Sequence, residues 1–370
     1  METNDKTMIP AKALHPGEVL REELAERGIK QKDFAKQIGV QASHLNEFIK
    51  GKRDLNKDLA MKLEEHTSIS FNNWMNLQNG YYYDRNAIAR REQEEVTARR
   101  YEDECGKIFN INILYKKLGI SSFSCAERLR QIKDLLHFDL LSAESLQLQL
   151  SGFYKHSEKA AVDDKNMLAW LILNQIRIEK AARVEYCFRK GEAEAAAKEI
   201  AQKANNRNLS VSFIKECLNK HGIQYVEVEK LEKAPIDAYS TMHNGHPVIS
   251  VTYRYNDMDK LAFDIIHELY HIDNHLSDTD SAFIAIDSGM YSTDPREREA
   301  NAFAQRTLIP DSVWKEIMRT KSSSLSPHII VRTIAKSAER EGVSPSIAVA
   351  RYKRETNWYK TSSFRSPKIF

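Results

Sequence analysis

Two histidines and a glutamate lie within five residues of one another, at His267, Glu268 and His271, in the segment FDIIHELYHIDNH. On an α-helix, residues four apart share a face, so both imidazoles can point at one metal ion. Glu268 can then act as a general base toward a water molecule whose pKa a zinc ion lowers to about 7. The spacing therefore predicts a zinc site with hydrolytic chemistry.

A helix over residues 258–276 would position this motif, since Phe263, Ile266 and Tyr270 form an apolar stripe that no Gly or Pro interrupts. A second helix is expected to begin at Pro295 and to carry a third ligand. Two histidines and one carboxylate with an open fourth position are typical of catalytic zinc.

Glu297 and Glu299 are both possible third ligands on this second helix. Asn301 lies four residues after Glu297, and we expect it to orient a histidine ligand; a solvated helical Asn is the alternative. Four side chains could stabilise an oxyanion, although a structural or surface role is the alternative for each of them: His243, His246, Tyr270 and His275.

The motif continues with E-x-x-A-N-x-F-A from Glu297, 26 positions after His271, and with L-I-P from Leu308. This combination, over residues 209–318, resembles the ImmA/IrrE family of zinc metallopeptidases. The resemblance implies that His267, His271 and Glu297 hold zinc and that Glu268 is the general base. It favours Glu297 over Glu299 and implies a short strand at 247–251 before the metal helix.

The first 80 residues predict a bundle of five short helices, at 16–27, 31–38, 42–50, 57–66 and from about 70 onward. The turn near Gly39 has helix-turn-helix spacing, which would place helix 42–50 in a DNA major groove. Gln and Asn suit adenine edges, and cations suit phosphates. The residues expected at DNA are Gln31, Gln41, Ser43, His44, Asn46, Lys52 and Arg53.

The segments HPGEVLREEL, QKDFAKQIGV, GKR and NNWMNLQ resemble the HigA-type branch of Xre/Cro-like antitoxin and repressor domains. The resemblance implies binding of operator DNA, typically as a homodimer. A helical bundle that binds protein instead is the alternative. Residues 1–80 contain 12 basic and 12 acidic residues, so DNA affinity would depend on a few placed side chains and on dimerisation.

The whole chain has 370 residues, a net charge of +3 and only 13 Gly, which favours a helix-rich protein. It contains no Gly-rich phosphate loop, no apolar run near the length of a membrane span and no signal peptide, so a cytoplasmic location is expected. The widely spaced cysteines are expected to be reduced core residues: Cys105, Cys125, Cys187 and Cys217.

We expect a mainly α protein with an α+β, zincin-like metallopeptidase domain. The expected divisions are a helix-turn-helix domain at 1–80, a helical middle segment at 81–205, the metallopeptidase domain at 206–325 and a helical, basic segment at 326–370. Two short strands are expected, at 224–228 and 247–253.

The expected function is a cytosolic transcriptional regulator with a zinc-dependent endopeptidase. It would cleave a repressor, an antitoxin-type protein or itself, in a stress, phage or toxin–antitoxin response. The expected partners are double-stranded operator DNA and a protein substrate, toxin or repressor, with no membrane. The alternative is a non-proteolytic, HigA-like antitoxin or repressor that uses the metallopeptidase fold for sensing or partner binding.

Overall fold

The computed structural model describes residues 9–135, 163–182, 184–276, 282–286, 294–319, 326–359 and 364–370. The chain divides into two compact units. The first contains residues 1–101 and 124–126, and the second contains residues 102–123 and 127–370. No helix within the described ranges is both long enough and apolar enough to cross a membrane.

The N-terminal bundle consists of short helices close to the predicted bounds. They are α1 (Pro16–Glu26), α2 (Gln31–Gln37), α3 (Ala42–Ile49) and α4 (Lys57–His66), followed by α5 (Phe71–Ile108). All nine apolar side chains that fall at helical spacing are buried in one core: Leu20, Leu24, Phe34, Ile38, Leu45, Phe48, Ile49, Leu59 and Leu63. Helix periodicity alone therefore identified this core.

Helix α5 is a single helix of 38 residues, where a short fifth helix and a charged segment were expected. The charged part, with the sequence RREQEEVTARR, is mostly exposed, which suits a solvated helix.

The rest of the described chain contains further helices and four strands that form a small sheet. The helices are α6 (Ile111–Leu118), α7 (Cys125–Leu135), α9 (Asp164–Lys180), α10 (Glu192–Asn205), α11 (Val211–Lys220), α12 (Met258–Asn274), α13 (Pro295–Leu308), α14 (Asp311–Arg319), α15 (Pro327–Arg340) and α16 (Pro345–Thr356). The strands are β1 (Gln224–Glu227), β2 (Ile236–His243), β3 (His246–Val251) and β4 (Ala282–Ile286). The protein is thus mainly α with one α+β region.

The described strands form one sheet in the order β1-β3-β2-β4. Strand β1 runs parallel to β3, and β2 is antiparallel to both β3 and β4. The sequence predicted β1 and β3 but not the other two. Strand β2 is buried at five consecutive residues, so it lacks the apolar–polar alternation that marks a half-exposed strand.

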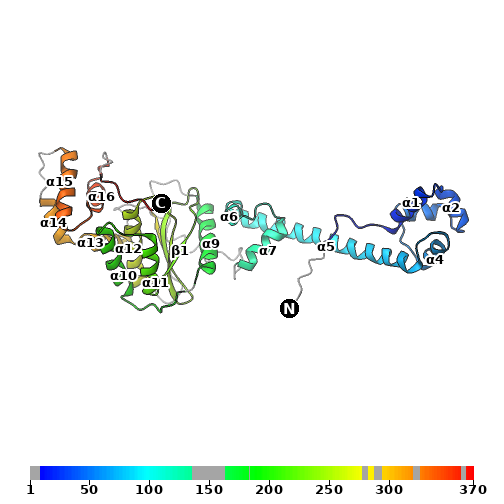
Figure 1. Cartoon of the computed structure of the whole chain (residues 1–370), viewed down its shortest axis with the longest axis horizontal. Coiled ribbons are helices and arrows are strands. Elements are labelled where there is room, and N and C mark those ends of the chain that lie inside the picture. The colour runs from blue at the N-terminus through cyan, green and yellow to red at the C-terminus, as the bar shows by residue number, and fades with distance from the viewer. Residues whose placement is uncertain are drawn as a thin grey trace. The chain divides into compact units, whose positions relative to one another are not determined.

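Helices cover both faces of this sheet. Figure 1 shows α10, α11 and α12 on one side of the strands and α9 on the other. The ring of Trp170 on α9 lies 5.8 Å from that of Tyr239 on β2, whereas the next residue, Ser240, contacts α12. Neighbouring strand residues point to opposite faces, so β2 links the two helical layers.

The expected division at residue 205 falls between α10 and α11. Both helices bury apolar side chains in the same core as α12, and α10 packs directly on α12. Of the free cysteines, Cys105, Cys125 and Cys217 are buried as predicted. The prediction is wrong for Cys187, which is exposed because it lies between α9 and α10, outside any helix.

Candidate metal centre and nucleic-acid interface

Helix α12 presents His267 and His271 on one face, as the spacing predicts. The helix begins where the Asp257 side chain accepts a hydrogen bond from the Lys260 backbone N–H, and it continues to Asn274. Both imidazoles are buried, and their Nε2 atoms lie 3.1 Å apart. The two nitrogens therefore converge on one point.

Helix α13 brings a carboxylate to the same point. Its first turn begins at Pro295, with the Asp294 side chain accepting from the Arg296 backbone N–H. One oxygen of Glu297 lies 3.2 Å from Nε2 of His267, and the other lies 3.3 Å from Nε2 of His271. The alternative ligand, Glu299, is exposed and lies instead 3.7 Å from Nε2 of His275.

Two imidazole nitrogens and one carboxylate are a donor set that suits zinc, and these atoms all lie within 4.8 Å of one another. Burial alone would raise the pKa of Glu297, but hydrogen bonds with the two histidines outweigh burial and lower it. Burial also lowers the pKa of His271, to about 4. Although burial opposes it, Glu297 raises the pKa of His267, so Glu297 stabilises a positive charge on this imidazole.

Glu268, the next residue on α12, is completely buried. Its Oε2 accepts a hydrogen bond of 2.5 Å from the hydroxyl of Ser240, while its Oε1 has no hydrogen-bond partner within the described residues. Burial raises the pKa of Glu268 to about 8. A carboxyl group with a pKa near neutrality can both accept and donate a proton at physiological pH.

Sequence reasoning missed Ser240, because only the pairing of β2 within the sheet places it under α12. An ion pair also joins α12 to β2. The Lys260 ammonium lies 2.9 Å from Asp237 of β2 and 3.0 Å from Asp264 of α12. The Lys260–Asp237 ion pair thus joins the helix that carries Glu268 to the strand that carries Ser240.

Among the other side chains considered, His275 is closest to the donor set. Its Nδ1 lies 2.8 Å from Nδ1 of His271, which leaves Nε2 of His271 facing Glu297. Tyr270 packs on Phe303 and hydrogen-bonds to Glu299. His243 pairs with Glu179 at 3.7 Å. Asn301 is half-buried on α13, and its role in orienting a histidine stays a prediction.

The N-terminal bundle places the residues expected at DNA on α2, on α3 and in the turn that follows α3. Gln31, Gln41, Ser43, Lys52 and Arg53 are exposed, whereas His44 and Asn46 are half-buried. Gln41 is the N-cap of α3, yet its side chain makes no capping hydrogen bond. Arg53 pairs with Glu47 at 3.0 Å, both side chains being about half exposed. Helices α1 and α2 pack on α3.

Comparison with known families separates the same two regions. Residues 20–73 match the helix-turn-helix family, and residues 218–353 match the IrrE N-terminal-like domain family of M78 peptidases. The chain therefore joins an N-terminal Xre-type helix-turn-helix domain to an ImmA/IrrE-like domain.

Individual relatives match about a fifth of the chain. Virulence-associated protein I of Dichelobacter nodosus is 36% identical over 70 residues, which cover 19% of this chain and 65% of that protein. The chain thus spans slightly less than two thirds of this relative's length. A crystal structure of PA4674 from Pseudomonas aeruginosa, in complex with its 28 bp operator DNA, is similar at 32% identity. It covers 22% of this chain and 91% of its own, with a TM-score of 0.21.

Proposed function

We propose that the protein is a cytoplasmic transcriptional regulator whose ImmA/IrrE-like domain is a zinc-dependent endopeptidase. The convergence of His267, His271 and Glu297 beside the buried carboxyl group of Glu268 supports the enzymatic half. The helix-turn-helix domain supports the regulatory half, with double-stranded operator DNA as its ligand.

In this proposal His267, His271 and Glu297 hold the zinc ion. When bound, zinc would polarise a peptide carbonyl and lower the pKa of water toward neutrality. Glu268 takes the proton of the attacking water and delivers it to the leaving amine. Ser240 fixes the Glu268 carboxylate through its hydrogen bond, so that Oε1 remains available for the proton.

The substrate in this proposal is a protein partner of repressor or antitoxin type, or the chain itself, cleaved in a stress, phage or toxin–antitoxin response. The DNA-binding form would be a homodimer, because the N-terminal bundle has no net charge to support binding by one copy. If the peptidase domain cleaves a repressor, its activity and DNA binding by the helix-turn-helix domain would both change transcription.

The test combines metal analysis with cleavage of the proteins encoded beside this gene. Glu268→Gln should retain the zinc that depends on His271 but lose cleavage, since the amide cannot accept the proton. His271→Ala should lose both the zinc and the cleavage. Glu299→Gln, on the exposed side of α13, is the matched control and should retain both.

Cleavage by Glu268→Gln at the wild-type rate would contradict the mechanism. A wild-type protein that holds zinc, binds its operator and cleaves neither itself nor any of these proteins would favour the non-proteolytic regulator instead.

A further inference from the structure

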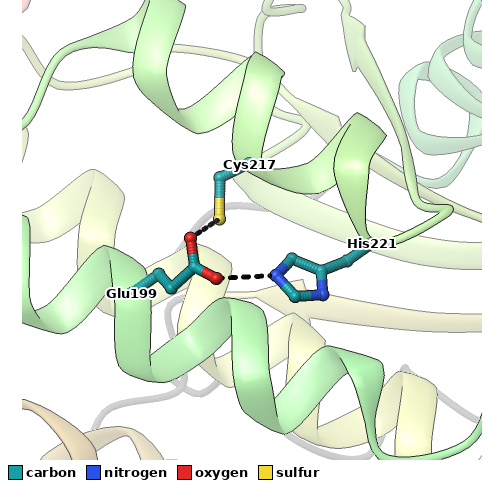
Figure 2. Close-up of side chains that lie close together, drawn as sticks. All are labelled: Glu199, Cys217 and His221. Atoms are coloured by element: carbon teal, nitrogen blue, oxygen red, sulfur yellow. Dashed lines mark hydrogen bonds and ion pairs between the residues drawn. The ribbon is translucent and has the colours of Figure 1, made fainter.

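A second group of metal-binding side chains lies on α10 and α11, away from His267 and His271. Cys217 and His221 are four residues apart at the C-terminal end of α11, and Glu199 faces them from α10 (Figure 2). Sγ of Cys217 lies 3.9 Å from Oε2 of Glu199, and Nε2 of His221 lies 3.1 Å from Oε1. Cys217 and His221 are buried, and Glu199 is half-buried.

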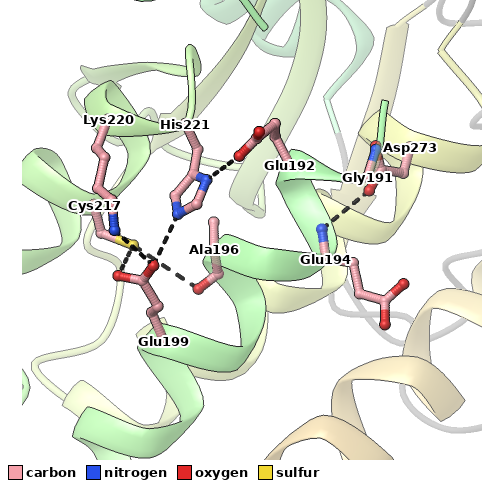
Figure 3. A network of polar contacts seen from close by, with 9 residues as sticks. All are labelled: Gly191, Glu192, Glu194, Ala196, Glu199, Cys217, Lys220, His221 and Asp273. Carbon is pink, nitrogen blue, oxygen red and sulfur yellow. Dashed lines mark hydrogen bonds and ion pairs between the residues drawn. The ribbon is translucent and has the colours of Figure 1, made fainter. Parts of the chain in front are cut away.

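The other nitrogen of His221 is already held. Nδ1 lies 2.5 Å from a carboxylate oxygen of Glu192, at the start of α10 (Figure 3). In metal sites, a histidine that binds through one nitrogen usually donates a hydrogen bond from the other nitrogen to a carboxylate, which fixes the ring orientation. Glu192 therefore orients His221 so that Nε2 faces Cys217 and Glu199.

We propose that Glu199, Cys217 and His221 form a second metal site, which binds one thiophilic divalent transition-metal ion, with zinc as the best fit. Zinc binds thiolate at about 2.3 Å and imidazole or carboxylate at about 2.0 Å, so tetrahedral donors lie about 3.3–3.5 Å apart. Nε2 of His221 lies 3.1 Å from one oxygen of Glu199 and Sγ of Cys217 lies 3.9 Å from the other, and one ligand atom from each of the three residues lies within 4.8 Å of the other two. Small side-chain rotations would complete the site.

A reactive or redox-sensing thiol fits this environment less well. Burial, together with the nearby charge of Glu199, raises the pKa of Cys217 to about 12. The thiolate is the form that reacts, so the thiol on its own is inert at neutral pH. A bound cation would reverse this balance, because metal ligation deprotonates a coordinating thiol.

Lys220 is the competing cation at this site. Its ammonium lies 2.9 Å from Oε1 of Glu199, on a side chain that is 63% exposed. A purely structural ion-pair network would use Lys220 as a member, whereas a metal ion would displace it toward solvent. Replacing Lys220 therefore distinguishes a structural ion-pair network from a metal site.

The site is linked to the first metal centre through α10. The carboxylate of Asp273, two residues after His271 on α12, accepts hydrogen bonds from the backbone N–H groups of Gly191 and Glu194 (Figure 3). An ion that joins α10 to α11 would thus stabilise the helix that packs on α12 and is capped by it.

The test is a Co²⁺ titration of the full-length, metal-stripped protein, followed by absorbance. A thiolate–cobalt charge-transfer band can arise only where a cysteine is a ligand, and the donor set of His267, His271 and Glu297 contains no sulfur. We expect the band in wild type, in His267→Ala and in Cys187→Ser, which removes an exposed cysteine as a control. We expect no band in Cys217→Ser. Zinc content should fall from two ions per chain to one in either Cys217→Ser or His267→Ala.

Two further variants keep the proposal decidable if Cys217→Ser fails to fold. Glu199→Gln retains the side-chain shape and should weaken Co²⁺ binding at the thiolate site by about tenfold or more. Lys220→Met should tighten it, because a competing cation is removed. The proposal is overturned if wild type gives no thiolate band, if the band survives in Cys217→Ser, or if neither Glu199→Gln nor Lys220→Met changes the cobalt affinity.

Discussion

The hydroxyl of Ser240 donates a 2.5 Å hydrogen bond to Oε2 of Glu268, which joins strand β2 to the helix that carries both histidines. Within the described part of the chain, it is the one hydrogen bond that the buried carboxyl group of Glu268 makes. Strand β2 therefore does more than complete the sheet, because it supports the group proposed as general base.

Removing this hydroxyl should destabilise the protein. Ser240→Ala leaves Glu268 without a donor in a buried site, and the loss of such a partner costs about 1–3 kcal/mol of unfolding free energy. Ser250→Ala is a matched control, since Ser250 is equally buried on β3 and its hydroxyl has no partner within the described residues. Chemical denaturation of both variants measures the difference. Equal stability of the two would contradict the supporting role of Ser240.

The close approach of α1 to α3 makes Gly17 irreplaceable. A Cβ atom at Gly17 would lie 2.0 Å from the Phe48 carbonyl oxygen, so Gly17→Ala forces α1 away from α3 at a cost of about 1–3 kcal/mol or more. Gly80→Ala, in helix α5 with open space around it, should instead stabilise by about 0.5–1 kcal/mol. Hydrogen exchange of the peptides from α1 and α3 reports the effect. Unchanged protection in Gly17→Ala would show that this packing tolerates a methyl group.

The contribution of Glu95 to stability should depend on pH. Its carboxylate accepts hydrogen bonds from the backbone N–H groups of Ala126 and Cys125, which lower its pKa to about 2. A depressed pKa stabilises the fold above the ordinary value near 4.5, and the effect is lost as the pH falls from there toward 2.

Comparison of Glu95→Gln with wild type by thermal unfolding tests this dependence. The variant should be less stable at pH 7, and the gap should close as the pH falls below about 4.5. Glu92→Gln changes an exposed carboxylate on the same helix and should show no such gap. If the stability difference between Glu95→Gln and wild type stays constant down to pH 2, the ionisation of Glu95 is not its cause.

Substitutions near α3 should separate DNA affinity from sequence preference. Lys52→Ala and Arg53→Ala should weaken binding to all sequences and reduce the salt dependence by about one unit each. Asn46→Ala should lose about 1–3 kcal/mol of discrimination at one base pair while largely retaining nonspecific binding. Titrations of each variant with the promoter of its own operon and with unrelated DNA measure both effects. Wild-type binding by all three variants would remove α3 as the reading helix.

Local patterns in the sequence were sufficient for the elements that carry the first site. His267 and His271 share a face because a helix repeats every 3.6 residues, and the start of α13 at Pro295 follows from local rules of helix capping. The bundle core was predictable for the same reason, since its apolar residues recur at helical spacing.

Only the tertiary structure decided which distant side chains meet. Nothing local marks Ser240 as the partner of Glu268, because β2 is buried without alternation and its register is set by pairing with β3 and β4. Likewise, Cys217 and Glu199 lie on separate helices whose packing brings sulfur, nitrogen and oxygen donors together. Periodicity reports how a residue relates to its own element, whereas a site assembled from several elements depends on long-range packing that no single segment encodes.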